Sequence, residues 1–186
     1  GEFSEYLPDW HPYEDYRSFY MAKKSQGGGS ILDQSHIMDL VHYLLGGFEF
    51  VWAYTANLSP LELDADDYAE MTVRLKSGAL ASIHTDIFGR DHKKQLEIKG
   101  TEGNLYWDHY LNQVHHYDAK TKTTTVYKKF PTDFNLNYLE QTRHFLACCE
   151  GAEVSRASLQ EGIETMELIL AAEKSQETGL VEKVGG

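Results

Sequence analysis

The sequence predicts an α+β fold, in which an open, mainly antiparallel sheet has helices packed on one face. Hydrophobic residues recur at helical spacing before residue 46 and after residue 132, and alternate with polar residues in between. Tight turns separate the alternating segments. Short strands joined by such turns pair antiparallel, because parallel strands need long crossovers. The alternation gives the sheet one core-facing side, which the helices are expected to cover.

The first part of the chain predicts three segments. Residues 7–12 read Leu-Pro-Asp-Trp-His-Pro, which is typical of an extended stretch stiffened by proline. Residues 13–24 predict a short helix that ends at the glycine run 27–29. An amphipathic helix is then expected over 30–45, stopped by Gly46 and Gly47. Its hydrophobic residues fall at i, i+3, i+4, i+7 and i+8: Ile37, Leu40, Val41, Leu44 and Leu45.

Between residues 50 and 130 the hydrophobic period changes to two. Met71, Val73 and Leu75 alternate with polar residues, and a turn at 77–78 leads to a second strand. Leu96 and Ile98 alternate in the same way before a turn at 100–103. Another hairpin is expected around 118–122. The closing helices are predicted from about 132 to 151 and from about 158 to 175, the second opening with a Ser-Leu-Gln-Glu capping box.

Length and composition bound the class of protein. With 186 residues the chain makes about one domain, and its 41% hydrophobic and 25% charged residues are typical of a soluble globular protein. A net charge of −12 without a basic stripe argues against nucleic-acid and anionic-membrane partners. No membrane span or signal peptide is recognisable. The two cysteines, Cys148 and Cys149, are adjacent and cannot build a disulfide framework, so a reducing cytoplasm is the expected location.

Asp33, His36 and Asp39 stand at three-residue steps near the start of the amphipathic helix. An acid beside an imidazole at this place suits a proton relay or a metal ligand. A structural interpretation fits the same spacing. Ser30 and Asp33 match a Ser-x-x-Asp cap, so Asp33 would only accept backbone N–H bonds. His36 would then be a half-buried histidine with one satisfied nitrogen.

The sequence contains no G-x-G-x-x-G, Walker, H-E-x-x-H or G-x-S-x-G motif. If this is an enzyme domain, it therefore lacks a dinucleotide or triphosphate site of its own. That expectation limits the chemistry that the chain could perform alone.

Residues 27–46, GGGSILDQSHIMDLVHYLLG, resemble the GG-x-x-x-D…H-x-x-D helix of the glucose–fructose oxidoreductase and inositol dehydrogenase (Gfo/Idh/MocA) family. Residues 6–17, residues 96–108 and the two closing helices agree with the same family. The resemblance covers the carboxy-terminal, substrate-binding domain. It implies that residues 1–186 are a single substrate-binding and oligomerisation domain, and that the Rossmann domain, which binds NAD or NADP, is absent from this chain.

The resemblance also implies an activity, namely oxidation of a sugar, sugar derivative or polyol hydroxyl by hydride transfer to NAD or NADP. His36 would exchange the hydroxyl proton and Asp33 would orient the hydroxyl or the imidazole, beside a lysine of the nucleotide domain. The commonest family spacing is Asp-x-x-x-His, whereas Asp33 precedes His36 by three residues. This shift turns Asp33 by about 100° on a continuous helix. The family's domains pair through their sheets, which implies a homodimer or tetramer.

An aromatic cluster with an arginine precedes the helix and suits a sugar, because aromatic rings stack on sugar rings and a guanidinium donates to hydroxyls or phosphates. The candidate substrate-binding residues are Trp10, His11, Tyr13 and Arg17. Alternatively, Trp10 and Tyr13 only pack their loop against the sheet.

Two other functions fit the residues. One is a non-catalytic binding or oligomerisation module that uses the same sheet without chemistry. The other is a metal hydrolase or isomerase with zinc or manganese on His11, Asp33, His36 and Asp39. The family resemblance makes the oxidoreductase the leading hypothesis, and its predicted site contains no metal.

Overall fold

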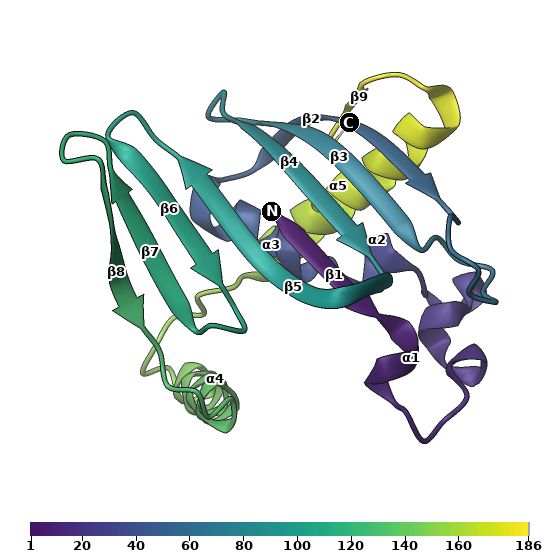
Figure 1. The fold of residues 1–186 in the computed structure, drawn as a ribbon, viewed down its shortest axis with the longest axis horizontal. Helices are drawn as coiled ribbons and strands as arrows, with labels where there is room; N and C mark the ends of the chain where they lie inside the picture. The colour runs from purple at the N-terminus through teal and green to yellow at the C-terminus, as the bar shows by residue number, and fades with distance from the viewer. Residues whose placement is uncertain (186) are drawn as a thin grey trace. The chain divides into compact units, whose positions relative to one another are not determined.

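The computed structural model describes residues 1–185 and divides them into two compact units. The first unit holds Gly1–Gln95 together with the residues from Gln160 onward, and the second holds Leu96–Leu159. Figure 1 labels the helices and strands of both units. Within residues 1–185, no helix combines the length and apolarity that crossing a bilayer needs.

The first unit is built on a mixed, mainly antiparallel sheet whose strand order is β5-β1-β4-β3-β2-β9. The strands are β1 (Glu2–Tyr6), β2 (Phe48–Ala56), β3 (Tyr68–Leu75), β4 (Leu80–Asp86), β5 (Phe88–Lys99) and β9 (Glu182–Lys183). The predicted turn at 77–78 joins β3 to β4, with Gly78 at a φ of 86°. The α+β class and the mainly antiparallel pairing predicted from the alternation are confirmed.

Strand β1 is an inner strand of this sheet, which the sequence did not predict. It pairs parallel to β4, where Phe3 lies opposite Thr85, and antiparallel to β5, where Phe3 lies opposite Lys94. The Phe3 side chain is only 3% exposed. A five-residue strand with no turn beside it has little pattern of its own, and its partners lie more than 80 residues further along the chain.

Two helices, α3 (His36–Leu45) and α5 (Leu159–Thr178), contribute to the core against one face of the sheet, as predicted (Figure 1). Ile37, Val41 and Leu168 are at most 1% exposed. Burial alternates along β3, and the residues buried on the strands include Val51, Met71 and Ile83. The helices therefore pack against this face of the sheet, as the spacing of the hydrophobic residues predicted.

Two predictions for the first part of the chain are wrong. Residues 7–12 do not stay extended, because Leu7–Trp10 form one helical turn (α1) with its proline at the start, where a missing N–H costs nothing. Residues 13–24 do not form one helix. Three 3₁₀ turns replace it, η1 (Tyr16–Ser18), η2 (Tyr20–Ala22) and η3 (Lys24–Gln26), because Met21 and Ala22 anchor the segment in a small core with Leu7 and Ile87.

The predicted helix over 30–45 is interrupted. It consists of α2 (Ser30–Asp33) and α3, separated by Gln34 and Ser35. Gln34 is fully buried, and its Nε2 donates to the backbone oxygen of Asp86 at 2.9 Å. A tertiary hydrogen bond thus ends the first turn, although the apolar period continues across the break.

The second unit continues β5 into β6 (Gly103–Asp108), β7 (Gln113–Asp118) and β8 (Thr123–Lys129), followed by α4 (Asn135–Cys149). Strands β6, β7 and β8 pair antiparallel in that order. The turn at 100–103 is closed by the Gly100 N–H, which donates to Gly103 at 2.8 Å. The hairpin predicted around 118–122 is confirmed, with Lys122 at a φ of 56°.

The sheet face opposite the helices carries a carboxylate–imidazole–carboxylate line. Nδ1 of His84 lies 3.0 Å from Oε2 of Glu70, and its Nε2 lies 2.8 Å from Oδ2 of Asp86. The hydrogen bond with Asp86 and then that with Glu70 raise the pKa of His84, against the opposite effect of burial. Protonated His84 therefore binds β3 and β4 together through its two carboxylate neighbours.

This line predicts a pH dependence of stability. Folding raises the pKa of His84. The stabilisation that His84 gives the folded state is therefore fully present below the pKa of the unfolded state, about 6.5, and is lost as pH rises through the pKa of the folded state. Urea unfolding at a series of pH values should show the free energy of unfolding falling over this window. The variant His84→Gln should show a smaller fall, and identical pH profiles for the two proteins would contradict the prediction.

Candidate functional site

The amino end of α3 is positioned by the break in the predicted helix. Because α2 ends at Asp33, His36 becomes the first residue of α3, and no side chain caps that end. The Ser-x-x-Asp cap does not form. Gly29 is the residue that caps α2, and Oδ2 of Asp66 accepts from the Ser30 hydroxyl at 2.7 Å and from the Ile31 N–H at 3.0 Å. The Asp33 carboxylate is thus left for another partner.

That partner is Tyr20, whose hydroxyl donates a short hydrogen bond to Oδ1 of Asp33. The glycine run allows this contact. A Cβ on Gly28 would lie 2.3 Å from the Tyr20 carbonyl oxygen, so only glycine lets the chain pass there, and the Gly29 N–H donates to Met21 at 3.0 Å. The hydrogen bond to Asp33 and then burial raise the pKa of Tyr20 to about 12. Asp33 is therefore held as an acceptor in a fixed direction.

His36 is open to solvent on one side, while its ring lies 6.1 Å from the buried Phe3 ring, centroid to centroid. Burial lowers the pKa of His36, and the charge of Lys94 lowers it further. Asp33 and Asp39 act in the opposite direction, without reversing the shift. The imidazole is consequently neutral at pH 7 and can accept a proton.

Lys94 is a site residue that the sequence analysis missed. Its Nζ lies 4.5 Å from the centroid of the Phe3 ring, on the side of the sheet that faces α3. Burial lowers the pKa of Lys94, although the Glu5 carboxylate opposes this. The sequence does indicate that Lys94 points inward. It stands two and four residues before Leu96 and Ile98, and residues at this spacing lie on the same face of a strand.

The predicted substrate-binding residues separate into two sets. The centroid of the His11 ring lies 4.5 Å from that of Phe19, which lies 5.3 Å from that of Tyr20, so two tilted ring contacts connect His11 to the partner of Asp33. Tyr13 is 80% exposed, with its ring 6.0 Å from that of His11. Phe19 and Tyr20 lie in an irregular segment, so no helical or strand spacing of hydrophobic residues could predict their contacts from the sequence.

Trp10 and Arg17 have other contacts. Trp10 packs against the core of Leu7, Met21 and Ile87, in line with the structural alternative for this residue. The Arg17 guanidinium is bound at 2.9 Å by Asp15 and at 3.2 Å by Glu62, which raises its pKa. The metal alternative needs three or more clustered ligands, and no such group occurs within residues 1–185.

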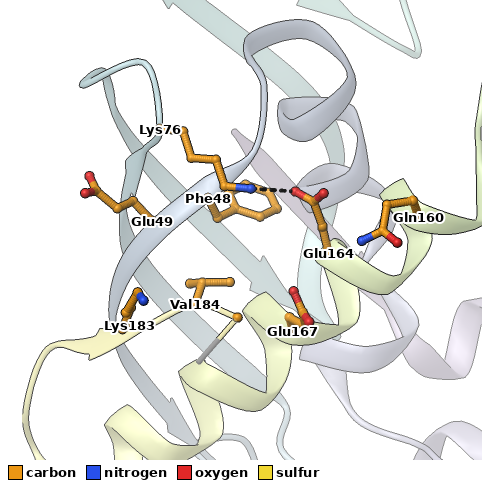
Figure 2. Close-up of a pocket in the computed structure, with 9 residues that line it drawn as sticks. Phe48, Glu49, Lys76, Gln160, Glu164, Glu167, Lys183 and Val184 are labelled. Carbon is orange, nitrogen blue, oxygen red and sulfur yellow. Dashed lines mark hydrogen bonds and ion pairs between the residues drawn. The ribbon is translucent and has the colours of Figure 1, made fainter.

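A separate hollow of about 320 Å³ lies between α5, β2 and β9, and Figure 2 shows its lining. Two of its charged groups, Lys76 and Glu164, form an ion pair. Oε2 of Glu164 accepts from Lys76 at 3.0 Å and lies 3.2 Å from Nε2 of His42. None of the sequence-predicted site residues lines this hollow, so the amino end of α3 remains the candidate site.

Comparison with protein families matches residues 7–184 to the family described as "Oxidoreductase family, C-terminal alpha/beta domain", the Gfo/Idh/MocA group. The resemblance read from the sequence is thereby confirmed. Comparison with curated proteins finds no match.

Solved structures share the fold. The WlbA dehydrogenase from Bordetella pertussis, in complex with NADH and UDP-GlcNAcA, is 21% identical with a TM-score of 0.74, covering 100% of this chain and 55% of that one. Levoglucosan dehydrogenase with NADH and levoglucosan is 19% identical with a TM-score of 0.81, covering 100% and 57%. A putative oxidoreductase from Thermotoga maritima is 20% identical with a TM-score of 0.78, covering 98% and 53%. The chain thus spans little more than half the length of these proteins, and at such identities the likeness shows the fold alone.

Proposed function

This chain belongs to the Gfo/Idh/MocA oxidoreductase family as its C-terminal alpha/beta domain, and we propose that it is the substrate-binding domain of an NAD(P)-dependent enzyme. The enzyme would oxidise or reduce a hydroxyl-bearing carbon of a sugar, sugar derivative or polyol. The observation that carries this proposal is the position of His36 at the uncapped start of α3, three residues after Asp33 at the end of α2, where burial and the charge of Lys94 lower the pKa of the imidazole.

Oxidation of a secondary alcohol removes a hydride from carbon and a proton from oxygen. The nicotinamide ring supplies the hydride acceptor when the dinucleotide is bound. His36 accepts the hydroxyl proton, because an imidazole whose pKa lies below its ordinary value is neutral at pH 7 and is a competent base there. Asp33, held by the Tyr20 hydroxyl, orients the substrate hydroxyl toward that base. The same groups return the proton in the reverse reaction.

NAD or NADP would be held mainly by a nucleotide-binding domain outside this chain. Two observations support this. The sequence has no glycine-rich phosphate-binding turn, and the matched dehydrogenase structures from B. pertussis and for levoglucosan carry NADH on chains almost twice as long. The described residues fit the role of a substrate and proton site rather than a dinucleotide cradle.

The sheet face opposite the helices is the proposed contact with a second copy of the chain. It exposes large apolar side chains on β2 and β4, with Trp52 41%, Tyr54 46% and Leu80 73% exposed. Large apolar side chains exposed on one face of a sheet favour its use as an interaction surface. Light scattering of the full-length protein should give the mass of a dimer or tetramer, and a monomeric mass at micromolar concentration would contradict the contact.

The activity is tested on the full-length protein that contains this chain. Sugars, sugar derivatives and cyclitols are supplied with NAD⁺ or NADP⁺, and nicotinamide absorbance is followed. We expect reduction of the dinucleotide with at least one of these classes. If absorbance never changes and the protein binds neither dinucleotide, the domain is instead a non-catalytic binding or oligomerisation module.

A further inference from the structure

A small hollow of about 320 Å³ opens in the first unit between the end of β1, the start of β5 and the loop that joins β2 to β3. Its walls are Tyr6, Phe88, Arg90 and residues 58–61. Arg90 is the one charged side chain among these walls, and none of them is acidic. Neither the residues around His36 nor the exposed apolar side chains of the proposed contact between copies line the hollow. It is therefore a separate feature of the first unit.

Arg90 differs from every other arginine of the chain, because it forms no ion pair within residues 1–185. The others each pair with a carboxylate: Arg17 with Asp15, Arg74 with Glu49, Arg143 with Glu140 and Arg156 with Glu153. Acidic side chains outnumber lysines and arginines by 29 to 17, so a carboxylate is the usual neighbour of an arginine in this protein. The Arg90 guanidinium instead keeps its N–H donors for an acceptor that comes from solution.

The Tyr6 ring holds the guanidinium in place. Cζ of Arg90 lies over this ring, 3.5 Å from its centroid, which is within the range of a cation–π interaction. Stacking of this kind uses the flat face of the guanidinium and leaves its N–H edges open. The ring thus orients Arg90 without neutralising it. A carboxylate that enters the hollow can then accept two parallel N–H bonds in the plane of the group.

The loop side of the hollow is fixed by a buried carboxylate. Asp67 is 0% exposed, and its two oxygens accept from the backbone N–H groups of Leu58 and Ser59, each at 2.8 Å. Leu61 of the same loop packs against the small core of the first unit. The apolar wall that this loop contributes is therefore formed before any ligand binds, as in most sites for small molecules.

We propose that this hollow binds a small monocarboxylate with an aromatic or aliphatic body, a ligand separate from the substrate of the proposed oxidoreductase. The carboxylate pairs with the Arg90 guanidinium, and the body of the ligand contacts Phe88 and the apolar loop wall. A sugar fits poorly, because its hydroxyls would lose water to apolar walls without gaining partners. A phosphate dianion also fits poorly, because one guanidinium balances one negative charge in a chain whose net charge is −12.

The test titrates the full-length protein with phenylacetate and three related compounds, and calorimetry measures each Kd. Phenylacetamide has the same shape without the charge, acetate has the charge without the ring, and phenyl phosphate carries a phosphate. Phenylacetate should bind with a Kd of about 0.1–1 mM. It should bind about 10- to 100-fold more tightly than phenylacetamide, the usual effect of a charge-assisted hydrogen bond.

Arg90→Met should bring phenylacetate and phenylacetamide within about threefold. Arg90→Lys keeps the charge without the planar fork and should retain part of the preference. Arg90 is exposed, so neither substitution should unfold the protein.

Arg74→Met is the matched control, because it removes an exposed arginine that already pairs with Glu49 at 3.3 Å. It should keep the preference for phenylacetate. His36→Asn should leave phenylacetate binding within about twofold, because His36 does not line the hollow. Equal affinity for phenylacetate and phenylacetamide, tighter binding of acetate or phenyl phosphate, or an unchanged preference in Arg90→Met would each overturn the proposal. Loss of phenylacetate binding in His36→Asn would place the ligand in the substrate site and would likewise reject it.

Discussion

Replacing His36 with asparagine in the full-length protein is expected to lower kcat by about 100- to 10,000-fold, the usual contribution of a positioned general base. Asparagine keeps a polar side chain at the first position of α3 but cannot take a proton. Substrate Kd should stay within a few-fold, because the ring contact with Phe3 is the main packing that is lost. Steady-state kinetics and calorimetric binding measure the two effects separately.

The pH profile sharpens this prediction. His36 acts as a base only when neutral, and burial with the charge of Lys94 lowers its pKa. In the direction of alcohol oxidation, kcat/KM should therefore hold down to about pH 6.5 and fall below it. This acid limb should vanish in His36→Asn.

The control for His36 is His42→Asn on the same helix. His42 is 8% exposed and pairs with Glu164 away from the site, so its loss should cost stability and leave kcat intact. If His36→Asn keeps more than about a tenth of the wild-type kcat, His36 lacks the role of a general base.

Replacing Asp86 with alanine is expected to lower the free energy of unfolding by about 3–5 kcal/mol, the usual cost of removing one member of a buried ion pair. Asp86 is 4% exposed. Its Oδ1 accepts from the Phe88 N–H at 3.2 Å and the Gly89 N–H at 2.6 Å, while its Oδ2 meets His84. Alanine would leave these donors without their carboxylate acceptor in a partly buried region.

Urea unfolding at neutral pH measures this loss, with Asp91→Ala as the control. Asp91 lies on β5 and is exposed, so its replacement should change stability by less than about 0.5 kcal/mol. Burial alone raises the pKa of Asp86, but hydrogen bonds from His84, Ser4 and the backbone outweigh it and lower that pKa. The Asp86 contribution is therefore present above pH of about 3.9 and lost on further acidification. Equal losses in the two variants would refute this role of Asp86.

Local pattern was enough to predict most of the sheet and its coverage by helices. The parity of Met71, Val73 and Leu75 predicts the buried face of β3, because burial alternates strictly along a strand. Tight turns predict the antiparallel hairpins for the same local reason. Inner strand β1 escaped prediction, since its place depends on partners that are far away in the sequence.

The site was predictable in part. Spacing alone singled out Asp33 and His36, but the periodic pattern extended the helix through Gln34, where a buried hydrogen bond to the Asp86 backbone breaks it. Tyr20 reaches Asp33 only through the close approach of Gly28, and this contact has no signature in residue spacing. The roles of Asp33, His36, Trp10, His11, Tyr13 and Arg17 in binding or chemistry remain predictions.

The inner position of β1 has a consequence for how the first unit folds. Residues 2–6 pair with residues of β4 and β5 that lie more than 80 positions away along the chain. Closing so long a loop costs entropy before any strand pairing repays it. We therefore expect this unit to fold more slowly than a meander of the same size, with β1 pairing late.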